Sequence, residues 1–261
     1  MSKSLRARYG EWALVAGASQ GFGASLAADL ARRGMNVVLV SRREDLLEEL
    51  AQRLRSEYGV ESRCLVLDLA EPDFAEALAS AVADLDLGIL IYNAALVPVG
   101  PFPEMEEKTL EQLVSVNVRG PLLLTRALLP GMLDRGRGAV VLVSSLAGLQ
   151  GAPRVSAYSA SKAFNIVLAE ALWGELREQG IDVSVCCAGA MPTPGYLAST
   201  DWKSPGMLSP DDAARQTLDA LGKGPRFVPG WINRLSAQFM GRLLTRKAAV
   251  RLIAKNTRHL S

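Results

Sequence analysis

The chain has 261 residues, of which 49% are hydrophobic and 21% charged, and 29 basic against 27 acidic residues give a formal net charge of +2. This length predicts one α/β domain, or at most two small ones, and the composition excludes general disorder. The single histidine, His259, lies two residues from the end. Zinc sites built on several imidazoles, Ser/His/Asp triads and Cys/His dyads are therefore excluded, so we expect no metal and acid–base chemistry based on Tyr, Lys, Asp, Glu or Cys.

The N-terminal residues are positively charged, but no apolar segment follows them, and no run of about 18 apolar residues occurs anywhere. We therefore expect neither secretion nor membrane spanning. The three cysteines, Cys64, Cys186 and Cys187, show no C-x-x-C spacing and lie in apolar, strand-like runs. They are predicted to be core thiols of a reduced, cytoplasmic protein.

Short runs rich in Val, Leu and Ile alternate along the chain with segments whose apolar residues recur at helical spacing. The runs cover residues 12–17, 36–40, 64–69, 88–94, 139–145 and 182–189. The helical segments cover residues 26–34, 45–59, 74–85, about 110–135 and 161–180. Gly34, Gly59 and Gly180 suit left-handed caps at three helix ends. Strands that are apolar on both faces and alternate with helices predict a doubly wound, Rossmann-like α/β fold with a parallel sheet.

No repeat, low-complexity tract or linker interrupts the chain, so residues 1–261 are predicted to form one domain. Within it we expect a cofactor-binding and catalytic core at residues 10–194. A substrate flap and a helix are expected at 195–222, and a basic amphipathic C-terminal extension at 223–261.

The first strand runs directly into a glycine-rich turn that opens a helix. Gly17 permits a sharp turn, Gly21 lets the backbone approach a pyrophosphate, and Gly23 allows close packing of helix and strand. The other residues of this predicted cofactor loop are Ser19, Gln20 and Phe22. The spacing is G-x-x-x-G-x-G rather than the general G-x-G-x-x-G, but its place between strand and helix favours dinucleotide binding over a purely structural turn.

Two arginines follow the second strand, at the position that distinguishes the two nicotinamide cofactors. NAD-binding proteins place Asp or Glu there for the ribose hydroxyls, whereas a basic residue accommodates a 2′-phosphate. Here the strand is followed by Arg42 and Arg43, with no acidic residue before Glu44. A guanidinium matches a phosphate, so NADP(H) is the expected cofactor; the alternative is two solvated arginines at a strand end.

A tyrosine and a lysine four residues apart open the helical segment after the fifth strand. Tyr158 and Lys162 share one helix face, and a nearby cation favours the phenolate, which lowers the pKa of a phenol from about 10. Ser145 ends the fifth strand and Asn93 closes the fourth, at the carboxyl edge where open α/β folds bind ligands. Ser144 is the competing serine, but alternation along the strand predicts that it faces the opposite side.

Together these motifs resemble the short-chain dehydrogenase/reductase superfamily, of the compact single-domain type. The matching strings are AGASQGFG, VLDL with Asp68, YNAA, NVRG with Asn117, VSSLAG, YSASK and AGAMPTP, in the expected order over residues 12 to about 194. Ala95 and Ala188 stand where the family has glycine and proline. These two departures concern local backbone geometry and leave the polar residues intact.

The resemblance implies catalytic roles for four residues. Tyr158 would donate a proton to a substrate carbonyl oxygen as hydride arrives from a nicotinamide, and Ser145 would hydrogen-bond that oxygen. Lys162 would lower the pKa of Tyr158 and hold the nicotinamide ribose. Asn117 would order a water that links Lys162 to solvent.

The resemblance also implies contacts with the cofactor. Asp68 is expected at the adenine, Asn93 at the central cofactor site and Thr193 at the nicotinamide carboxamide. The remaining motif positions expected to contact the cofactor are Leu69, Ala94, Gly189 and Met191.

The favoured function is reduction of a ketone on a lipophilic substrate by NADPH, with a 3-oxoacyl thioester as the preferred substrate. Apolar residues after Pro194 would favour such a substrate if the segment forms a flap; the alternative is a loop that packs on the core. These residues are Tyr196, Leu197, Trp202, Met207 and Leu208. The second interpretation is an NADP-dependent dehydrogenase of steroids or other secondary alcohols, and an interpretation of another class is a non-catalytic NADP-binding sensor or scaffold.

Past Asp219 the chain has nine basic residues and no acidic one, so the body carries a formal charge of −7 and the tail +9. Apolar residues from Trp231 to Ile253 are interleaved with these cations, which predicts a basic amphipathic helix. Such a helix would lie on an anionic membrane surface, dock an acidic partner such as an acyl carrier protein, or pack on its own domain or a sister subunit. Nucleic acid is not expected as a partner. The family resemblance implies a homodimer or homotetramer, paired through the long helices after the fourth and fifth strands.

Overall fold

The computed structural model describes residues 4–200 and 206–259, and in these ranges seven parallel strands form one sheet. The strands are β1 (Trp12–Ala16), β2 (Asn36–Ser41), β3 (Ser62–Val66), β4 (Leu87–Tyr92), β5 (Gly138–Ser145), β6 (Ile181–Ala188) and β7 (Arg226–Phe227). Their order across the sheet is β3-β2-β1-β4-β5-β6-β7. The order reverses direction between β1 and β4, which is where doubly wound sheets open a crevice. The predicted doubly wound α/β fold is confirmed.

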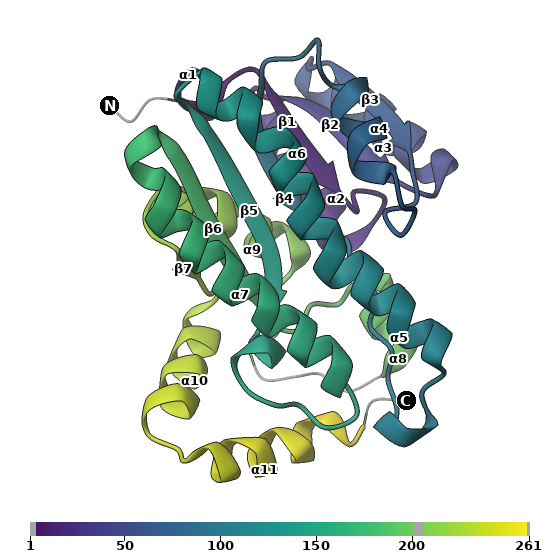
Figure 1. Ribbon diagram of the computed structural model, residues 1–261, viewed down its shortest axis with the longest axis vertical. Helices are drawn as coiled ribbons and strands as arrows, with labels where there is room; N and C mark the ends of the chain where they lie inside the picture. The colour runs from purple at the N-terminus through teal and green to yellow at the C-terminus, as the bar shows by residue number, and fades with distance from the viewer. Residues whose placement is uncertain (1–3, 201–205, 260–261) are drawn as a thin grey trace.

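Helices cover both faces of this sheet (Figure 1). They are α1 (Leu5–Tyr9), α2 (Gly21–Arg32), α3 (Glu44–Tyr58), α4 (Phe74–Ala81), α5 (Glu107–Val114), α6 (Gly120–Asp134), α7 (Ser156–Leu176), α8 (Pro194–Ser199), α9 (Pro210–Ala220), α10 (Trp231–Arg242) and α11 (Arg246–Thr257). Buried side chains of α2, α3 and α9 form one apolar core with the sheet, and those of α4, α6 and α7 form the other. In the part of the chain that the structure describes, no helix is both long enough and apolar enough to cross a membrane.

Three elements differ from the sequence-based expectation. The helix α1 and the strand β7 were not predicted, because five and two residues are too few to show a period. The C-terminal extension forms two helices rather than one. Thr245 begins the second of them, since its side chain accepts a hydrogen bond from the backbone N–H of Ala248 at 3.3 Å. The caps predicted at Gly59 and Gly180 have the left-handed conformation, as does Gly34 just after α2.

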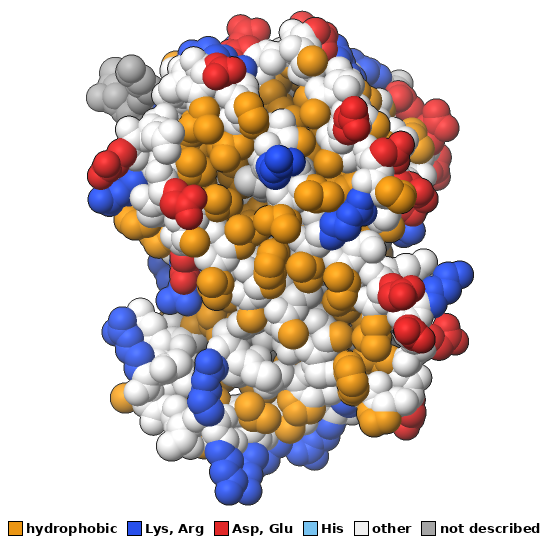
Figure 2. Space-filling view, viewed as in Figure 1, with side chains coloured by type: hydrophobic (Ala, Val, Ile, Leu, Met, Phe, Trp, Pro, Cys, Tyr) orange, Lys and Arg blue, Asp and Glu red, His pale blue; other side chains and the backbone are white. Residues whose placement is uncertain are grey.

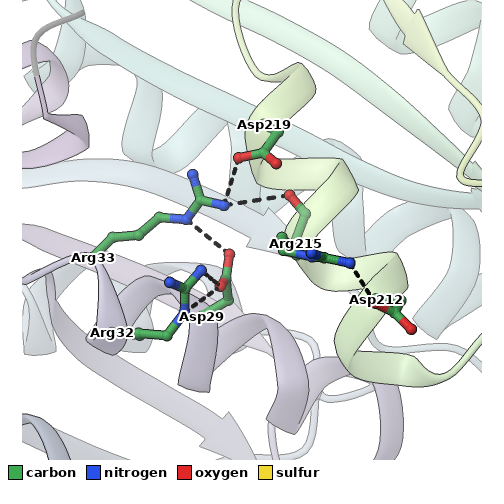
Figure 3. Close-up of polar contacts among 6 residues, drawn as sticks. All are labelled: Asp29, Arg32, Arg33, Asp212, Arg215 and Asp219. Atoms are coloured by element: carbon green, nitrogen blue, oxygen red, sulfur yellow. Dashed lines mark hydrogen bonds and ion pairs between the residues drawn. The ribbon is translucent and has the colours of Figure 1, made fainter.

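Figure 3 shows the polar contacts that join α2 to α9. Asp29, whose side chain is nearly buried, accepts hydrogen bonds from Arg32 Nε at 3.0 Å and Arg33 Nε at 2.8 Å. Arg33 also reaches α9, where its Nη2 donates to Asp219 Oδ1 at 2.7 Å and to the Arg215 carbonyl at 3.3 Å. Because α2 follows the glycine turn and α9 follows the predicted flap, this cluster fixes those two parts of the molecule relative to each other.

Apolar side chains gather over α6 and α7 on the face shown in Figure 2. Between the two helices lies an apolar groove of about 220 Å³. It is lined by Leu122, Thr125, Arg126, Leu129, Pro130, Leu133, Leu168 and Leu172. Leu122 and, on α7, Val167 are exposed. A contiguous apolar surface of this kind is typical of a protein–protein contact.

Candidate active site

A cleft of about 620 Å³ opens at the carboxyl ends of the central strands, a volume typical of small-molecule sites. Most of the predicted site residues line it. They are Gly17, Ser19, Gln20, Gly21, Phe22, Arg42, Arg43, Asp68, Leu69, Asn93, Ala94, Ser145, Tyr158, Lys162, Gly189, Met191 and Thr193. Two predicted residues, Gly23 and Asn117, are not part of the lining. The structure thus brings residues from the ends of six strands, β1 to β6, and from α7 to one cleft.

The glycine turn forms one wall and depends on the absence of side chains. Gly17 has a φ of +83°, and a Cβ there would lie 2.7 Å from the Ala94 backbone. Gly21 has a φ of +58°. A Cβ on Gly23 would lie 1.9 Å from the carbonyl oxygen of Gly17, which also accepts a hydrogen bond from Asn93 Nδ2 at 2.9 Å. Gly23 therefore packs α2 closely against the turn, as its place in the motif predicts, and is not among the residues that line the cleft.

The two arginines after β2 are held differently. Arg43 is bonded to the glycine turn itself, because its guanidinium donates to Gln20 Oε1 at 3.0 Å and to Ser19 Oγ at 2.7 Å. Arg42 is largely exposed and makes one long ion pair with Asp68, at 3.6 Å. Two guanidinium groups beside a glycine-lined helix N-terminus are a donor set that fits the phosphates of a dinucleotide.

Tyr158 and Lys162 enter the cleft from the first turns of α7, opposite the end of β5. The side chains of Tyr158 and Ser145 both line the cleft, and Ser145 lowers the pKa of the phenol. Ser145 Oγ also accepts from the backbone N–H of Ala147 at 3.1 Å, which fixes its position. Ser144 is buried, and its Oγ donates to the Lys162 carbonyl at 2.8 Å. The hydroxyl of Ser144 is thus used to hold α7, and that of Ser145 meets the phenol.

Burial controls the protonation of this group of residues. It raises the pKa of Tyr158 above its ordinary value of 10, and the hydrogen bond with Ser145 lowers that pKa part of the way. Burial lowers the pKa of Lys162 to about 8. The Lys162 ammonium donates to the Val143 carbonyl at 2.8 Å and lies 5.6 Å from the centre of the Tyr158 ring. Desolvation therefore leaves the pKa of Tyr158 raised, and the phenol keeps its proton at neutral pH; the lowering of this pKa by Lys162 that the resemblance implies stays a prediction.

Asn117 lies in a turn of π-helix, Ser115–Arg119, between α5 and α6. It is completely buried, and its amide makes a pair of 2.8 Å hydrogen bonds with the backbone N–H and carbonyl of Leu96. Its Nδ2 also donates to Ser161 Oγ at 3.1 Å. The side chain thus holds the loop after β4 and is not part of the lining of the cleft; the expectation that Asn117 orders a water stays a prediction. Local widening of a helix of this kind is frequent at functional sites.

Asn165 is a buried polar residue that sequence reasoning missed. It lies on α7 one turn beyond Ser161, and its Nδ2 donates to the Asn117 carbonyl at 3.2 Å. Its Oδ1 is buried without a hydrogen-bond partner among the described residues. The sequence does contain a sign of this role: Asn165 lies seven positions after Tyr158, and that spacing places the two residues on the same helix face. Asn165 therefore links the catalytic helix to the π-turn.

The other end of the cleft is bounded by the segments after β6. Thr193 caps α8, accepting from the backbone N–H of Tyr196 at 3.3 Å. Asn233 of α10 packs against Gly189, where a Cβ would lie 2.6 Å from its Nδ2. The exposed side chain of Leu197 lies on α8, whereas Trp202, another predicted flap residue, lies outside the described residues. Within the described ranges, no group of three or more His, Cys, Asp or Glu side chains is placed to hold a metal ion.

Replacing Lys162 by Met is expected to stabilise the fold at neutral pH. Folding lowers the pKa of Lys162 from 10.5 to about 8, so the cost of burying the ammonium is fully present below pH 8 and decreases as the pH rises toward 10.5. After allowing for the lost hydrogen bond to Val143, Lys162→Met should raise the free energy of unfolding by about 2 kcal/mol at pH 7.

Urea unfolding at pH 7 and pH 10 measures this difference. The exposed Lys108 on α5 provides the control, because Lys108→Met should leave the stability nearly unchanged. A Lys162→Met variant less stable than the wild type at pH 7, or equally affected at both pH values, would contradict the account.

Residues 11–204 match the family model of the short chain dehydrogenases. The chain is 36% identical over 234 residues to a 7beta-hydroxysteroid dehydrogenase of Clostridium sardiniense, and the match covers 88% of this chain and 90% of that protein. It is 34% identical over 181 residues to the very-long-chain 3-oxoacyl-CoA reductase of Rattus norvegicus, a match that covers 67% of this chain and 58% of that protein.

Two solved structures resemble this one closely. One comes from work on the stereoselectivity of 7beta-hydroxysteroid dehydrogenase; its TM-score is 0.90 at 31% identity, and the match covers 96% of this chain and 99% of that one. The other is a short-chain dehydrogenase from Sphingobium yanoikuyae in complex with NADPH. Its TM-score is 0.80 at 32% identity, and the match covers 88% of this chain and 93% of that one. The chain therefore belongs to the short-chain dehydrogenase/reductase family and is an oxidoreductase that acts on CH–OH/C=O groups.

Proposed function

We propose that the protein uses NADP(H) to interconvert a ketone and a secondary alcohol on a bulky lipophilic substrate, with a hydroxysteroid as the favoured substrate class. One observation carries the proposal. The side chains of Tyr158 and Ser145 line the same cleft as the glycine turn and the two arginines, and Ser145 lowers the pKa of the Tyr158 phenol. A proton donor and a dinucleotide-sized donor set thus share one site.

In this proposal Tyr158 is the proton donor to the substrate carbonyl oxygen, and bound NADPH supplies the hydride. Burial keeps the phenol protonated at neutral pH, so the proton is available when a ketone arrives. Ser145 is fixed by the Ala147 N–H and would hydrogen-bond the same oxygen. Lys162, with a pKa of about 8, would return a proton to Tyr158 after transfer. Asn117 and Asn165 would position the α7 helix and the adjacent loop.

The cofactor would lie across the carboxyl ends of the strands. We place its 2′-phosphate at Arg42, because this guanidinium is exposed and weakly paired, whereas Arg43 is already bonded to the glycine turn. The adenine end would lie by Asp68 and Leu69, next to β3. The nicotinamide end would lie near Tyr158, bordered by Asn93, Ala94, Gly189, Met191 and Thr193, which line the same cleft. The complex of the Sphingobium relative with NADPH supports this choice of cofactor.

Similarity over the whole chain favours a steroid. The 7beta-hydroxysteroid dehydrogenase structure matches 96% of this chain, so its similarity extends into the α10 and α11 region. The 3-oxoacyl thioester preferred from the sequence remains the second candidate, supported by the reductase of Rattus norvegicus over 67% of the chain. A non-catalytic sensor would have no need for Ser145 and Tyr158 in one cleft beside a buried Lys162.

We also propose that the apolar groove between α6 and α7 is a contact between copies of the chain. Its lining is almost entirely aliphatic, and Val167 on α7 is 67% exposed in the single chain. Burial of such a surface in a homodimer or homotetramer would remove it from water.

Arg42→Ala should weaken NADPH binding by roughly tenfold to a hundredfold and change NADH binding by no more than about twofold, because it removes a charge-assisted contact with the 2′-phosphate alone. Arg43→Ala should weaken both cofactors, since it also frees Ser19 and Gln20. Fluorescence titration measures both, with the exposed Arg53→Ala on α3 as the control. Tighter binding of NADH than NADPH by the wild type would refute the assignment of Arg42.

Tyr158→Phe should lower kcat by about 10²- to 10⁴-fold and leave the Kd of NADPH within about twofold, because it removes a general acid without changing the cleft. Turnover is measured with NADPH on a 7-ketosteroid and on 3-oxoacyl thioesters of increasing chain length. Tyr58→Phe, an exposed tyrosine on α3, should retain full activity. Retained turnover in Tyr158→Phe would refute the proton donor, and a preference for thioesters would replace the steroid by the second candidate.

A further inference from the structure

Helix α10 exposes large apolar side chains along one continuous face. Trp231, Ile232, Leu235 and Phe239, with Leu243 at its end, are between 37% and 73% exposed. With about 100° between successive residues, they span roughly 120° of the helix surface, over a length of about 18 Å. We call these five residues the apolar face of α10.

Packing on the rest of the domain does not explain this face. The residues of α10 that are buried or half-buried are Asn233, Ala237 and Met240, which lie together on another side of the helix. Their centre is roughly 150° from that of the apolar face. Asn233 fixes this inner side, since its Nδ2 donates to the Gly206 carbonyl at 3.1 Å and the Pro229 carbonyl at 3.0 Å. The apolar face of α10 therefore points away from the domain.

Helix α11, which follows α10, exposes cations. Lys247, Arg251, Lys255 and Arg258 lie within roughly 80° of one another around the helix and are exposed. Ala249 is buried on the opposite side. None of these four cations makes an ion pair with another described residue. In Figure 2 the lower left of the molecule, over α10 and α11, shows Lys and Arg side chains without an acidic one.

We propose that α10 and α11 dock the enzyme on an anionic lipid surface, with the apolar face of α10 inserted at the boundary between headgroups and acyl chains. An interface of this kind takes up Trp, Phe and Leu without a shaped groove, and anionic headgroups attract the neighbouring cations. An acidic protein partner would be recognised by the cations but would leave the apolar face unexplained. A two-fold contact between copies through α10 would bring the unpaired cations of both chains together.

The docking helices are attached to the walls of the cleft. Asn233 of α10 packs against Gly189, which lines the cleft, and Arg246 at the start of α11 donates to the Leu149 carbonyl at 2.9 Å, in the turn that follows Ser145. Docking would thus hold the cleft close to the lipid surface. A lipophilic substrate dissolved in the bilayer would then have a short path to Tyr158, a consequence that rests on the function proposed above.

The test is co-sedimentation of the NADPH-bound enzyme with vesicles of phosphatidylcholine alone or with phosphatidylglycerol added. We expect binding to the anionic vesicles that weakens as salt rises, and at least about tenfold weaker binding to the neutral ones. The double variant Trp231→Ser and Leu235→Ser should weaken binding to anionic vesicles at least about tenfold. The double variant Lys247→Gln and Arg251→Gln should weaken it by a similar factor. The tryptophan fluorescence should shift to the blue on binding, and Trp231→Phe should lose most of that shift while still binding.

The matched controls change exposed residues on α3 and α5. Tyr58→Ser is the control for the apolar double variant, and the double variant Arg53→Gln and Lys108→Gln is the control for the cations. Both controls should bind vesicles like the wild type. Absence of binding to anionic vesicles at low salt would overturn the proposal. So would retained binding by the α10 variant, a change in oligomeric state caused by that variant in light scattering, or binding to an acidic carrier protein in place of vesicles. Vesicle binding needs no turnover, so its failure is distinct from failure of the proposed reaction.

Discussion

The attachment of α7 to the end of β5 is the contact on which the candidate site depends. The Ser144 hydroxyl donates to the Lys162 carbonyl, and the Lys162 ammonium returns along the helix to donate to the Val143 carbonyl. The turn that follows β5 also approaches α7 so closely that a Cβ on Gly148 would lie 2.8 Å from the Lys162 backbone. Burying an ammonium costs free energy, which its pKa of about 8 reflects. These contacts hold Tyr158 at one position opposite Ser145.

A second set of close contacts brings the cofactor half of the cleft to this point. Asn93 bonds the glycine turn to the end of β4, and Asn117 bonds the following loop to the π-turn before α6. Asn165 then joins the π-turn to α7. Three side-chain amides, of which Asn117 and Asn165 are buried, therefore connect the dinucleotide side of the crevice to the catalytic helix. A side-chain amide can both donate and accept, as that of Asn117 does with Leu96, and so replaces a backbone pairing that the loop lacks.

The sequence predicts those parts of the molecule that follow from periodicity and strand ends. The apolar runs locate six of the strands, and residues at their carboxyl ends, such as Ser145 and Asn93, meet because parallel strands share one edge. The direction in which the pKa of Tyr158 shifts was not predictable, since it depends on how far burial outweighs the lowering by Ser145. The direction of the Asn117 side chain was not predictable either. It depends on a turn of π-helix, which leaves no periodic pattern in the sequence.

The C-terminal extension shows the same limit. Its charge and apolar content are plain in the sequence, but whether an apolar residue packs inward or outward is decided by tertiary contacts. Met240 is partly covered and Phe239, its neighbour, is exposed. Only the structure separates the inner side of α10, held by Asn233, from the apolar face of α10 that remains in solvent. The proposed substrate and the proposed surface role of the extension therefore draw on the sequence, on the structure and on the similar proteins together.

The central claim is that burial holds Tyr158 as a neutral acid beside Ser145. Carbon-13 NMR of protein labelled at the tyrosine Cζ tests it most directly, with Tyr158→Phe used to assign the signal. We expect the Tyr158 signal to stay at the neutral phenol position from pH 6 to beyond about pH 10, the pKa of an unperturbed phenol. A Tyr158 signal at the phenolate position near pH 7 would contradict it.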